Sequence, residues 1–158
     1  SCEMLSEENV SRAVQLLNKT NQVNLSTRRL SKEELLCWSE QENRECLVFS
    51  SKDRFGESGL IGLIGLESNN GSARLTDYII SCRVLGRGIE QVLLHVASEF
   101  VFKKGCKTLW AEYIPTKKNR PCLEIIQKIL RVDESNELRF FCDRTVGVPL
   151  PNHVQLKI

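Results

Sequence analysis

Three short runs of strand-forming residues, two of them separated by a strong turn signal, constrain this fold more than any other feature of the chain. The runs are Cys46–Phe49, Leu60–Leu66 and Arg74–Cys82. Between the last two, Ser68–Gly71 contains the Asn-Gly pair that favours a tight hairpin. We therefore expect these runs to form an antiparallel meander of three strands.

Apolar residues at helical spacing border the meander on both sides. Ser31 followed by Glu34 is a capping box, and Gly105 is a natural C-terminal residue for a helix that starts at Ile89. The whole pattern predicts an α/β (α+β) domain with the order α-α-β-β-β-α-β-α-β-β. Around the meander we expect helices over Glu7–Asn18, Lys32–Trp38, 89–104 and 119–130, and strands over Thr108–Ile114, Leu138–Cys142 and Val154–Ile158.

Length and charge fit one ordinary globular domain. The chain has 158 residues, which matches a single domain over residues 1–158, and its 22 Lys and Arg against 20 Asp and Glu give a net charge of +2. Dedicated nucleic-acid binders usually carry a strong basic excess, so the composition argues against a nucleic-acid partner. The longest uncharged apolar run, Gly59–Leu66, is too short to cross a membrane.

Seven cysteines and two histidines give little support to metal or nucleophile chemistry. No C-x-x-C pair occurs, so neither a zinc site nor a thioredoxin-type site is supported, and we expect no metal. The odd cysteine number favours reduced thiols in a cytoplasmic protein, and Ser1–Leu5 lacks the basic and apolar regions of a signal peptide. His95 and His153 lie in segments of ordinary structure, so no Ser/His/Asp or Cys/His site is expected.

Arg83–Gly88 is the most informative segment for function. It lies where the third strand ends and a helix begins, and a helix N-terminus offers unpaired N–H groups and the positive end of a dipole. Gly86 and Gly88 let a phosphate approach this backbone closely. The antiparallel strand before the turn argues against a dinucleotide-binding fold, and the lack of a following Gly-Lys-Ser/Thr argues against a Walker A loop. The alternative is a tight turn with two convenient glycines.

The Arg-x-x-Gly-x-Gly spacing of this turn resembles the acyl-CoA pyrophosphate loop of GNAT acetyltransferases. The expected element order agrees with that fold, a mostly antiparallel central sheet flanked by helices, except that its usual first strand is missing or lies upstream of Ser1. Three blocks resemble FkbH-like proteins more closely, and they occur in the same order and cover most of the chain. These blocks are Lys19–Arg29, Ser81–Gly88 and Glu112–Asn119.

The FkbH-like resemblance implies a larger protein. Such proteins join a HAD-like half to a C-terminal GNAT-like half, and this chain lacks the D-x-D-x-T motif of the first. The resemblance therefore implies an excised GNAT-like domain with a HAD-like domain upstream. It also implies acetyl-CoA or another acyl-CoA as cosubstrate. A small-molecule acceptor or an acyl carrier protein would be the partner, in a secondary-metabolite or polysaccharide pathway.

The GNAT resemblance assigns the ligand-binding residues. In that superfamily the pantetheine arm lies between two splayed strands and pairs with the backbone of the first, a role that falls on Ser81 and Cys82. The N–H groups of Leu85–Ile89 would hold the pyrophosphate, and Asn119 would touch the pantetheine arm. The expected ligand-binding residues are Ser81, Cys82, Arg83, Val84, Leu85, Gly86, Arg87, Gly88, Ile89 and Asn119.

The catalytic groups are harder to assign. Transfer from a thioester needs a base, an oxyanion donor and an acid for the leaving thiolate. The resemblance places that acid at Ile126, which cannot donate a proton. Tyr113 is then the candidate acid, and Asp77 and Glu112 are candidate bases. Each has a structural alternative, as a packed aromatic residue or as an ion-paired strand carboxylate.

The polar block Lys19–Arg29 connects the first two expected helices, and in this fold that connection borders the acceptor side of the cleft. Its side chains could bind an acceptor or a carrier-protein phosphate, or they could form a capping network that holds the loop. The expected acceptor-binding residues are Asn21, Gln22, Asn24, Arg28 and Arg29. Two functions remain open, an acyltransferase domain and a non-catalytic module that docks a loaded carrier protein for the HAD-like half.

Overall fold

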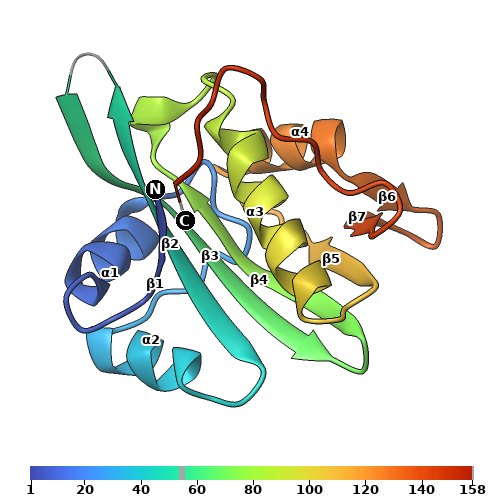
Figure 1. Ribbon diagram of the computed structural model, residues 1–158, viewed down its shortest axis with the longest axis horizontal. Helices are drawn as coiled ribbons and strands as arrows, with labels where there is room; N and C mark the ends of the chain where they lie inside the picture. Colours follow the sequence, from blue (N-terminus) through green and yellow to red (C-terminus); the bar gives the residue numbers. More distant parts are fainter. Residues whose placement is uncertain (54–55, 158) are drawn as a thin grey trace.

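The structure, a computed structural model, describes residues 1–53 and 56–157 and consists of one mixed sheet with helices on both faces (Figure 1). A 3₁₀ turn, η1 (Cys82–Val84), separates the fourth strand from the third helix. In chain order the other elements are β1 (Cys2–Met4), α1 (Val10–Lys19), α2 (Lys32–Ser39), β2 (Arg44–Asp53), β3 (Gly56–Asn69), β4 (Ser72–Ile80), α3 (Ile89–Lys103), β5 (Thr108–Glu112), α4 (Arg120–Ile129), β6 (Arg131–Asp133) and β7 (Asn136–Asp143).

The expected meander is confirmed and forms the centre of the sheet. The strand order is β1-β2-β3-β4-β5-β7-β6, and each neighbouring pair is antiparallel except β4 with β5. Asn70 and Gly71 join β3 to β4 with φ values of 48° and 78°, as a tight hairpin requires. These features confirm the expected class, an α/β domain with a mostly antiparallel sheet flanked by helices.

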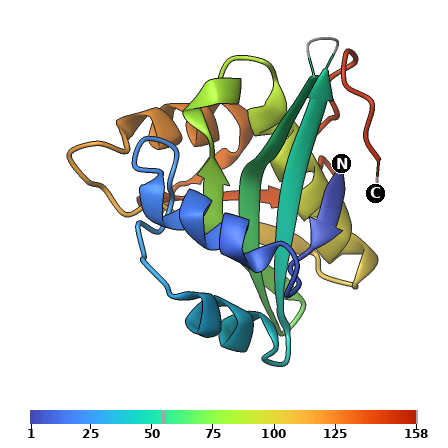
Figure 2. The same ribbon diagram turned by 90° about the vertical axis from the view of Figure 1, so that its left-hand side faces the viewer.

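α1 and α2 cover one face of the sheet, and α3 and α4 cover the other (Figures 1 and 2). Because successive strand residues point to opposite faces, neighbouring residues enter different cores. Val48 and Ile79 pack in the core under α1 and α2. Leu47 and Tyr78, each one position earlier in the chain, pack in the larger core under α3 and α4.

The helix boundaries follow the capping signals in part. Ser31 and Glu34 form the expected capping box at the start of α2, with Glu34 N–H 3.1 Å from Ser31 Oγ. α1 begins at Val10 rather than at Glu7, because Asn9 Oδ1 accepts the Ser6 N–H at 2.9 Å and closes a separate turn first. Within residues 1–53 and 56–157, no helix is long and apolar enough to cross a membrane.

Two expectations about the chain ends are wrong. The first strand is neither missing nor upstream, because β1 pairs with β2 and places Cys2 opposite Phe49. The described part of the expected last strand, Val154–Lys157, is irregular, and Ile158 lies outside the described residues. Lys157 only accepts the Cys2 N–H at 2.9 Å, since β1 already holds the edge beside β2. The other edge of the sheet is β6, a short strand whose polar sequence gave no strand signal.

Candidate functional site

The turn between β4 and α3 has a backbone suited to anion binding. Gly86 and Gly88 have φ values of 77° and 78°, a region where a side chain costs about 1–2 kcal/mol. Gly88 is the N-cap residue of α3, and Val92 N–H returns to Gly88 O at 3.2 Å. The N–H groups of the first helical turn therefore point out of the helix end, at the side where the chain arrives from β4 and η1.

Two side chains of the chain itself lie against this turn. Glu90, whose residue is only 9% exposed, accepts the Gly86 N–H with its carboxylate. His153 Nε2 lies 3.0 Å from Arg87 O, and a Cβ at Gly88 would lie 3.1 Å from the His153 ring. An incoming phosphate would therefore compete with the Glu90 carboxylate for the Gly86 N–H.

β4 ends before the residues that were expected to continue it. The sequence pattern predicts strand to Cys82, but β4 ends at Ile80, and Ser81 N–H bonds to Ile61 O at 2.8 Å on the β3 side. Cys82 is exposed, and Arg83 Nε donates to Ser81 Oγ at 3.1 Å. Ser81, Cys82 and Arg83 thus follow the strand instead of extending it, and they line a cleft beside the strand end. Their ligand roles stay predictions.

β4 and β5 diverge, and part of the chain lies in the gap between them. The two strands pair in parallel only as far as Leu75. Beyond that point Val23–Leu25, which we call the inserted segment, runs along the freed edge of β4. Ile80 N–H donates to Val23 O at 3.1 Å, and Leu25 N–H donates to Tyr78 O at 3.2 Å.

The inserted segment belongs to the connection between α1 and α2, yet its side chains reach the opposite face of the sheet. Val23 and Leu25 are 0% and 1% exposed and pack in the core under α3 and α4. Asn24, also buried, makes an antiparallel bridge with Ile79. Its Nδ2 donates to Thr20 O at 3.0 Å, which ties the segment to the end of α1. Asn24, an expected acceptor-binding residue, therefore uses its side chain for hydrogen bonds within the protein.

Asn119 is the central polar group of this region. It is fully buried, and its Nδ2 donates to Asn24 O at 3.1 Å and to Ile114 O at 2.9 Å. Its Oδ1 accepts the Tyr113 hydroxyl at 2.8 Å and the Thr116 N–H at 2.7 Å. The side chain thus joins the β5–α4 connection to the inserted segment and has no bond left for a ligand.

Asp77 is a buried ion-pair partner. Its carboxylate accepts from Arg28 through both oxygens, with Nε 2.8 Å from Oδ1, and it accepts the Ser26 hydroxyl at 2.7 Å. Asp77 is 0% exposed, and the Arg28 guanidinium also lies 4.4 Å from the centre of the Trp38 ring. This arrangement favours the structural alternative for both Asp77 and Arg28 over general-base and acceptor-binding roles.

Three further positions that the sequence analysis named, Glu112, Ile126 and Arg29, have the surroundings of ordinary structural residues. Glu112 is partly exposed and lies 3.6 Å from Arg74 in an ion pair, as a strand carboxylate often does. Ile126 is 0% exposed and packs in the larger core, so α4 offers no hydroxyl at that position. Arg29 is exposed and donates to Leu17 O at 3.0 Å and to Asn21 Oδ1 at 2.6 Å.

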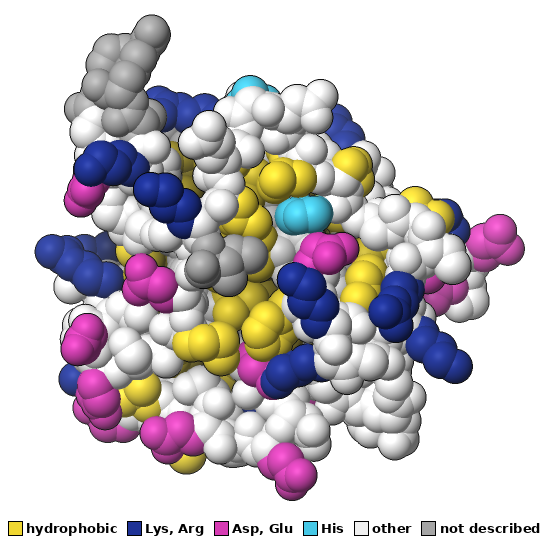
Figure 3. All heavy atoms as spheres, viewed as in Figure 1, with side chains coloured by type: hydrophobic (Ala, Val, Ile, Leu, Met, Phe, Trp, Pro, Cys, Tyr) yellow, Lys and Arg dark blue, Asp and Glu magenta, His cyan; other side chains and the backbone are white. Residues whose placement is uncertain are grey.

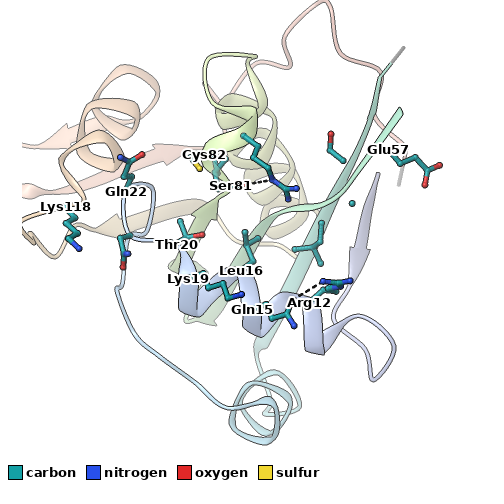
Figure 4. A pocket seen from close by; sticks show the side chains of 16 residues that line it. Arg12, Gln15, Leu16, Lys19, Thr20, Gln22, Glu57, Ser81, Cys82 and Lys118 are labelled. Atoms are coloured by element: carbon teal, nitrogen blue, oxygen red, sulfur yellow. Dashed lines mark hydrogen bonds between the residues drawn. The ribbon is translucent and has the colours of Figure 1, made fainter. Parts of the chain in front are cut away.

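A cleft of about 830 Å³ opens beside the end of β4, on the side of α1 (Figure 4). Among the described residues, four basic side chains line it and none of them has a carboxylate partner. Its acidic residue, Glu57, is paired with Lys52 at 2.9 Å. The cleft is therefore net positive, and Asn21 and Gln22 lie at its edge. The four basic residues are Arg12, Lys19, Arg83 and Lys118.

A second cavity, of about 850 Å³, lies between α3 and the C-terminal segment. In Figure 3, hydrophobic side chains gather near the middle of the face on which this segment runs alongside α3. Val92, Leu93 and Leu156 are among its lining residues. Both cavities reach the β4–α3 turn, the first at Arg83 and the second at Arg87.

Sequence reasoning missed three residues that shape the site, namely Ser26, Glu90 and His153. Glu90 had a usable signal, because an acid in the first turn of a helix competes with a bound anion for the same N–H groups. Ser26 and His153 had none, since their contacts join segments far apart in the sequence. Within the described part of the chain, no three His, Cys, Asp or Glu side chains form a group that could hold a metal ion.

Comparisons with known proteins give similarity in structure alone. No family model and no curated protein sequence matches the chain. Among solved structures, spermidine N-acetyltransferase from Vibrio cholerae, in complex with CoA and spermine, is 16% identical with a TM-score of 0.65, over 92% of this chain and 95% of that one. The GNAT domain of S. lividans PAT is 13% identical with a TM-score of 0.66, over 90% and 89%.

The match to the Escherichia coli ribosomal-protein-S18-alanine N-acetyltransferase covers 99% of both chains, at 11% identity and a TM-score of 0.64. These identities are too low to carry an activity or a substrate. Nothing in these matches links the chain to FkbH-like proteins or to a HAD-like domain. The chain has an antiparallel meander, a parallel β4–β5 pair that diverges after Leu75, and a glycine turn before α3. Together with the structural matches, these features show that it has the fold of the GNAT acetyltransferases.

Proposed function

We propose that this domain is an acyl-CoA-dependent acyltransferase, which binds acyl-CoA at the turn between β4 and α3 and transfers the acyl group to a small acceptor. The observation that carries the proposal is the meeting of three features at one end of β4: its divergence from β5, the turn with Gly86 and Gly88, and the N-terminus of α3. A pyrophosphate suits that helix end. One solved structure of the same fold holds CoA, which supports this ligand class.

The charge of the cleft supports an acidic acceptor. Arg12, Lys19, Arg83 and Lys118 line it without carboxylate partners in the described residues, so an anion would gain their combined field. The Vibrio cholerae enzyme was solved with spermine, a polycation, and the basic residues here disfavour such a molecule. A small phosphate- or carboxylate-bearing acceptor, or the phosphate of a carrier protein's phosphopantetheine, fits the cleft better.

A second candidate function is a docking module for a loaded carrier protein. Two observations favour it, the inserted segment in the gap between β4 and β5 and the buried Ile126 where an acid is expected. In this version the HAD-like domain proposed upstream would carry the chemistry. For the acyltransferase, we propose a secondary-metabolite or polysaccharide pathway, a proposal that rests on the FkbH-like sequence blocks.

Calorimetric titration with acetyl-CoA, CoA and a phosphopantetheinylated carrier protein tests the two functions. Each ligand that binds is then assayed for thiol release in the presence of small acidic acceptors. Acetyl-CoA binding with acceptor-dependent thiol release would support the acyltransferase. Preference for the carrier protein without thiol release would support the docking module. Binding of none of the three would contradict both.

Gly86→Asp and Gly86→Asn form a matched pair for the turn itself. A Cβ at Gly86 has no other atom within 4 Å, and Asn tolerates the left-handed φ of 77° better than most residues. Both variants carry similar backbone strain, so their difference reports the added negative charge. We expect the Asp variant to bind CoA at least about tenfold more weakly than the Asn variant. Equal affinities in two folded variants would remove the turn from the site.

A further inference from the structure

The freed edge of β4 offers one set of hydrogen-bonding groups, and the inserted segment already uses it. Tyr78 O and Ile80 N–H bond to Leu25 N–H and Val23 O at 3.2 Å and 3.1 Å. We propose that Val23–Leu25 is an intramolecular occupant of the acyl-pantetheine slot, and that a thioester enters only after this segment leaves. The inference rests on the proposed function, since it takes a pantetheine arm to lie along this edge.

Peptide and pantetheine compete for the edge because they share its chemistry. A pantetheine arm is a chain with two amide bonds, and an unpaired strand edge binds amide groups as it would bind another strand. The inserted segment satisfies both an acceptor and a donor of β4 in that way. Its buried Val23 and Leu25 side chains also fill the volume on the α3 and α4 side of the gap. One slot therefore cannot hold both chains at once.

Most of the contacts that hold the segment come from residues that the sequence assigned to the site, and Ser26 adds one more. Asn119 binds its middle through Asn24 O at 3.1 Å, and Tyr113 holds Asn119 from the other side at 2.8 Å. Downstream, Ser26 and Arg28 bind Asp77 on β4. These residues form one connected network, so the network specifies a closed slot in this conformation.

Departure of the segment would also change the candidate acid. Asn119 would lose Asn24 O, one of the acceptors that fix its amide, and Tyr113 is bonded to that amide. The movement that opens the slot would therefore also loosen the amide to which the phenol is bonded. In a protein whose binding-competent state is sparsely populated, the apparent affinity falls in proportion to that population. Acyl-CoA affinity in the wild type is thus set by how often the segment is out.

Leu25→Ala tests the inference, with Leu17→Ala as its matched control. Both leucines are at most 1% exposed, but the Leu17 side chain packs in the core under α1 and α2, away from the core that Leu25 enters. Leu17 meets the inserted segment only through its backbone oxygen, 3.4 Å from Asn24 Nδ2, and truncation of the side chain keeps that oxygen. Truncation at Leu25 weakens the closed state and should raise acetyl-CoA affinity at least about threefold, by the same population argument. Leu17→Ala should leave acetyl-CoA affinity unchanged. Equal affinities for both variants and the wild type would overturn the inference.

Hydrogen exchange on the wild-type protein gives a readout that needs no variant. Adding acetyl-CoA should speed exchange of the Leu25 N–H, which loses Tyr78 O, while the turn around Gly86 slows. Lys107 N–H, bonded to Gly71 O at 2.7 Å at the opposite end of β4, should not change and is the internal control. Acetyl-CoA binding with unchanged or slower exchange at Leu25 would overturn the inference and leave the proposed function standing. No acetyl-CoA binding by the wild type or by a folded Leu25→Ala variant would contradict both.

Discussion

The hydroxyl of Tyr113 donates to Asn119 Oδ1 in a buried hydrogen bond of 2.8 Å. Two residues that the sequence assigns to proton donation and to pantetheine contact are therefore partners in one contact. Burial also raises the pKa of the Tyr113 phenol above its ordinary value. A phenol that is held protonated and already bonded must change partner before it can protonate a leaving thiolate.

Tyr113→Phe separates its structural and catalytic roles. The substitution removes one hydrogen bond, while Asn119 Oδ1 keeps the Thr116 N–H at 2.7 Å. We expect the free energy of unfolding in urea to fall by about 1 kcal/mol. If the phenol is the acid, the rate of thiol release falls at least about tenfold as well. An unchanged rate would remove Tyr113 from the catalytic set.

Arg28 and Arg29 are adjacent in the chain, but we expect them to contribute very differently to the free energy of unfolding. Arg28→Ala leaves Asp77 buried without its cation, and we expect a loss of about 3 kcal/mol in the free energy of unfolding. Arg29 is exposed and bonds only neutral oxygens, so Arg29→Ala should cost about 1 kcal/mol or less. Urea denaturation of both variants measures the difference. Similar losses would show that the Arg28–Asp77 pair is not what holds this connection.

Glu90→Gln should strengthen CoA binding. The change keeps the side chain's shape and its acceptor oxygen for the Gly86 N–H but removes a negative charge from the first turn of α3. We expect CoA affinity to rise about threefold, the size of a helix-end charge effect. Glu99→Gln, at an exposed position near the other end of α3, is the control. A weaker or unchanged affinity would mean that the pyrophosphate does not lie at this turn.

Buried thiols predict a loss of stability in alkali. Burial raises the pKa of Cys2 and Cys142 to about 11, and that of Cys122 to about 12, from an ordinary value of 9.0. Above pH 9.0 the unfolded chain releases protons that the folded chain retains, so stability is intact below that pH and falls as pH rises through the folded pKa values. We expect the urea midpoint to fall between about pH 8 and about pH 10.5. A constant midpoint would contradict the burial of these thiols.

The sequence predicts this fold well wherever structure is local. The Asn70-Gly71 hairpin, the Ser31 capping box and the helical face of α3 depend on residues close in the chain, and each is confirmed. β1 was not predicted, because a three-residue strand is too short to show alternation, and its pairing depends on β2 far along the chain. The C-terminal segment was expected to be a strand because its apolar residues alternate, but Val154 and Leu156 pack against the larger core beside α3 without joining the sheet.

The candidate site is harder to predict than the fold. The Arg83–Gly88 spacing correctly indicates a glycine turn at a helix N-terminus. The polar block Lys19–Arg29 also stands out, but residue types alone do not distinguish ligand binding from internal bonding. Asn24 and Arg28 turn inward to Thr20 and Asp77, and only the folded chain shows it.

Cys82 gives this chain a reporter at the mouth of the cleft. It is exposed there, and Cys37 on α2 is the other exposed thiol, while the remaining five are buried. A thiol-reactive label should therefore modify Cys82 and Cys37 before the others, and a ligand in the cleft should shield only Cys82. The ratio of the two labelling rates measures how much of the cleft is occupied by ligand. It needs no engineered residue, and Cys37 is the internal standard.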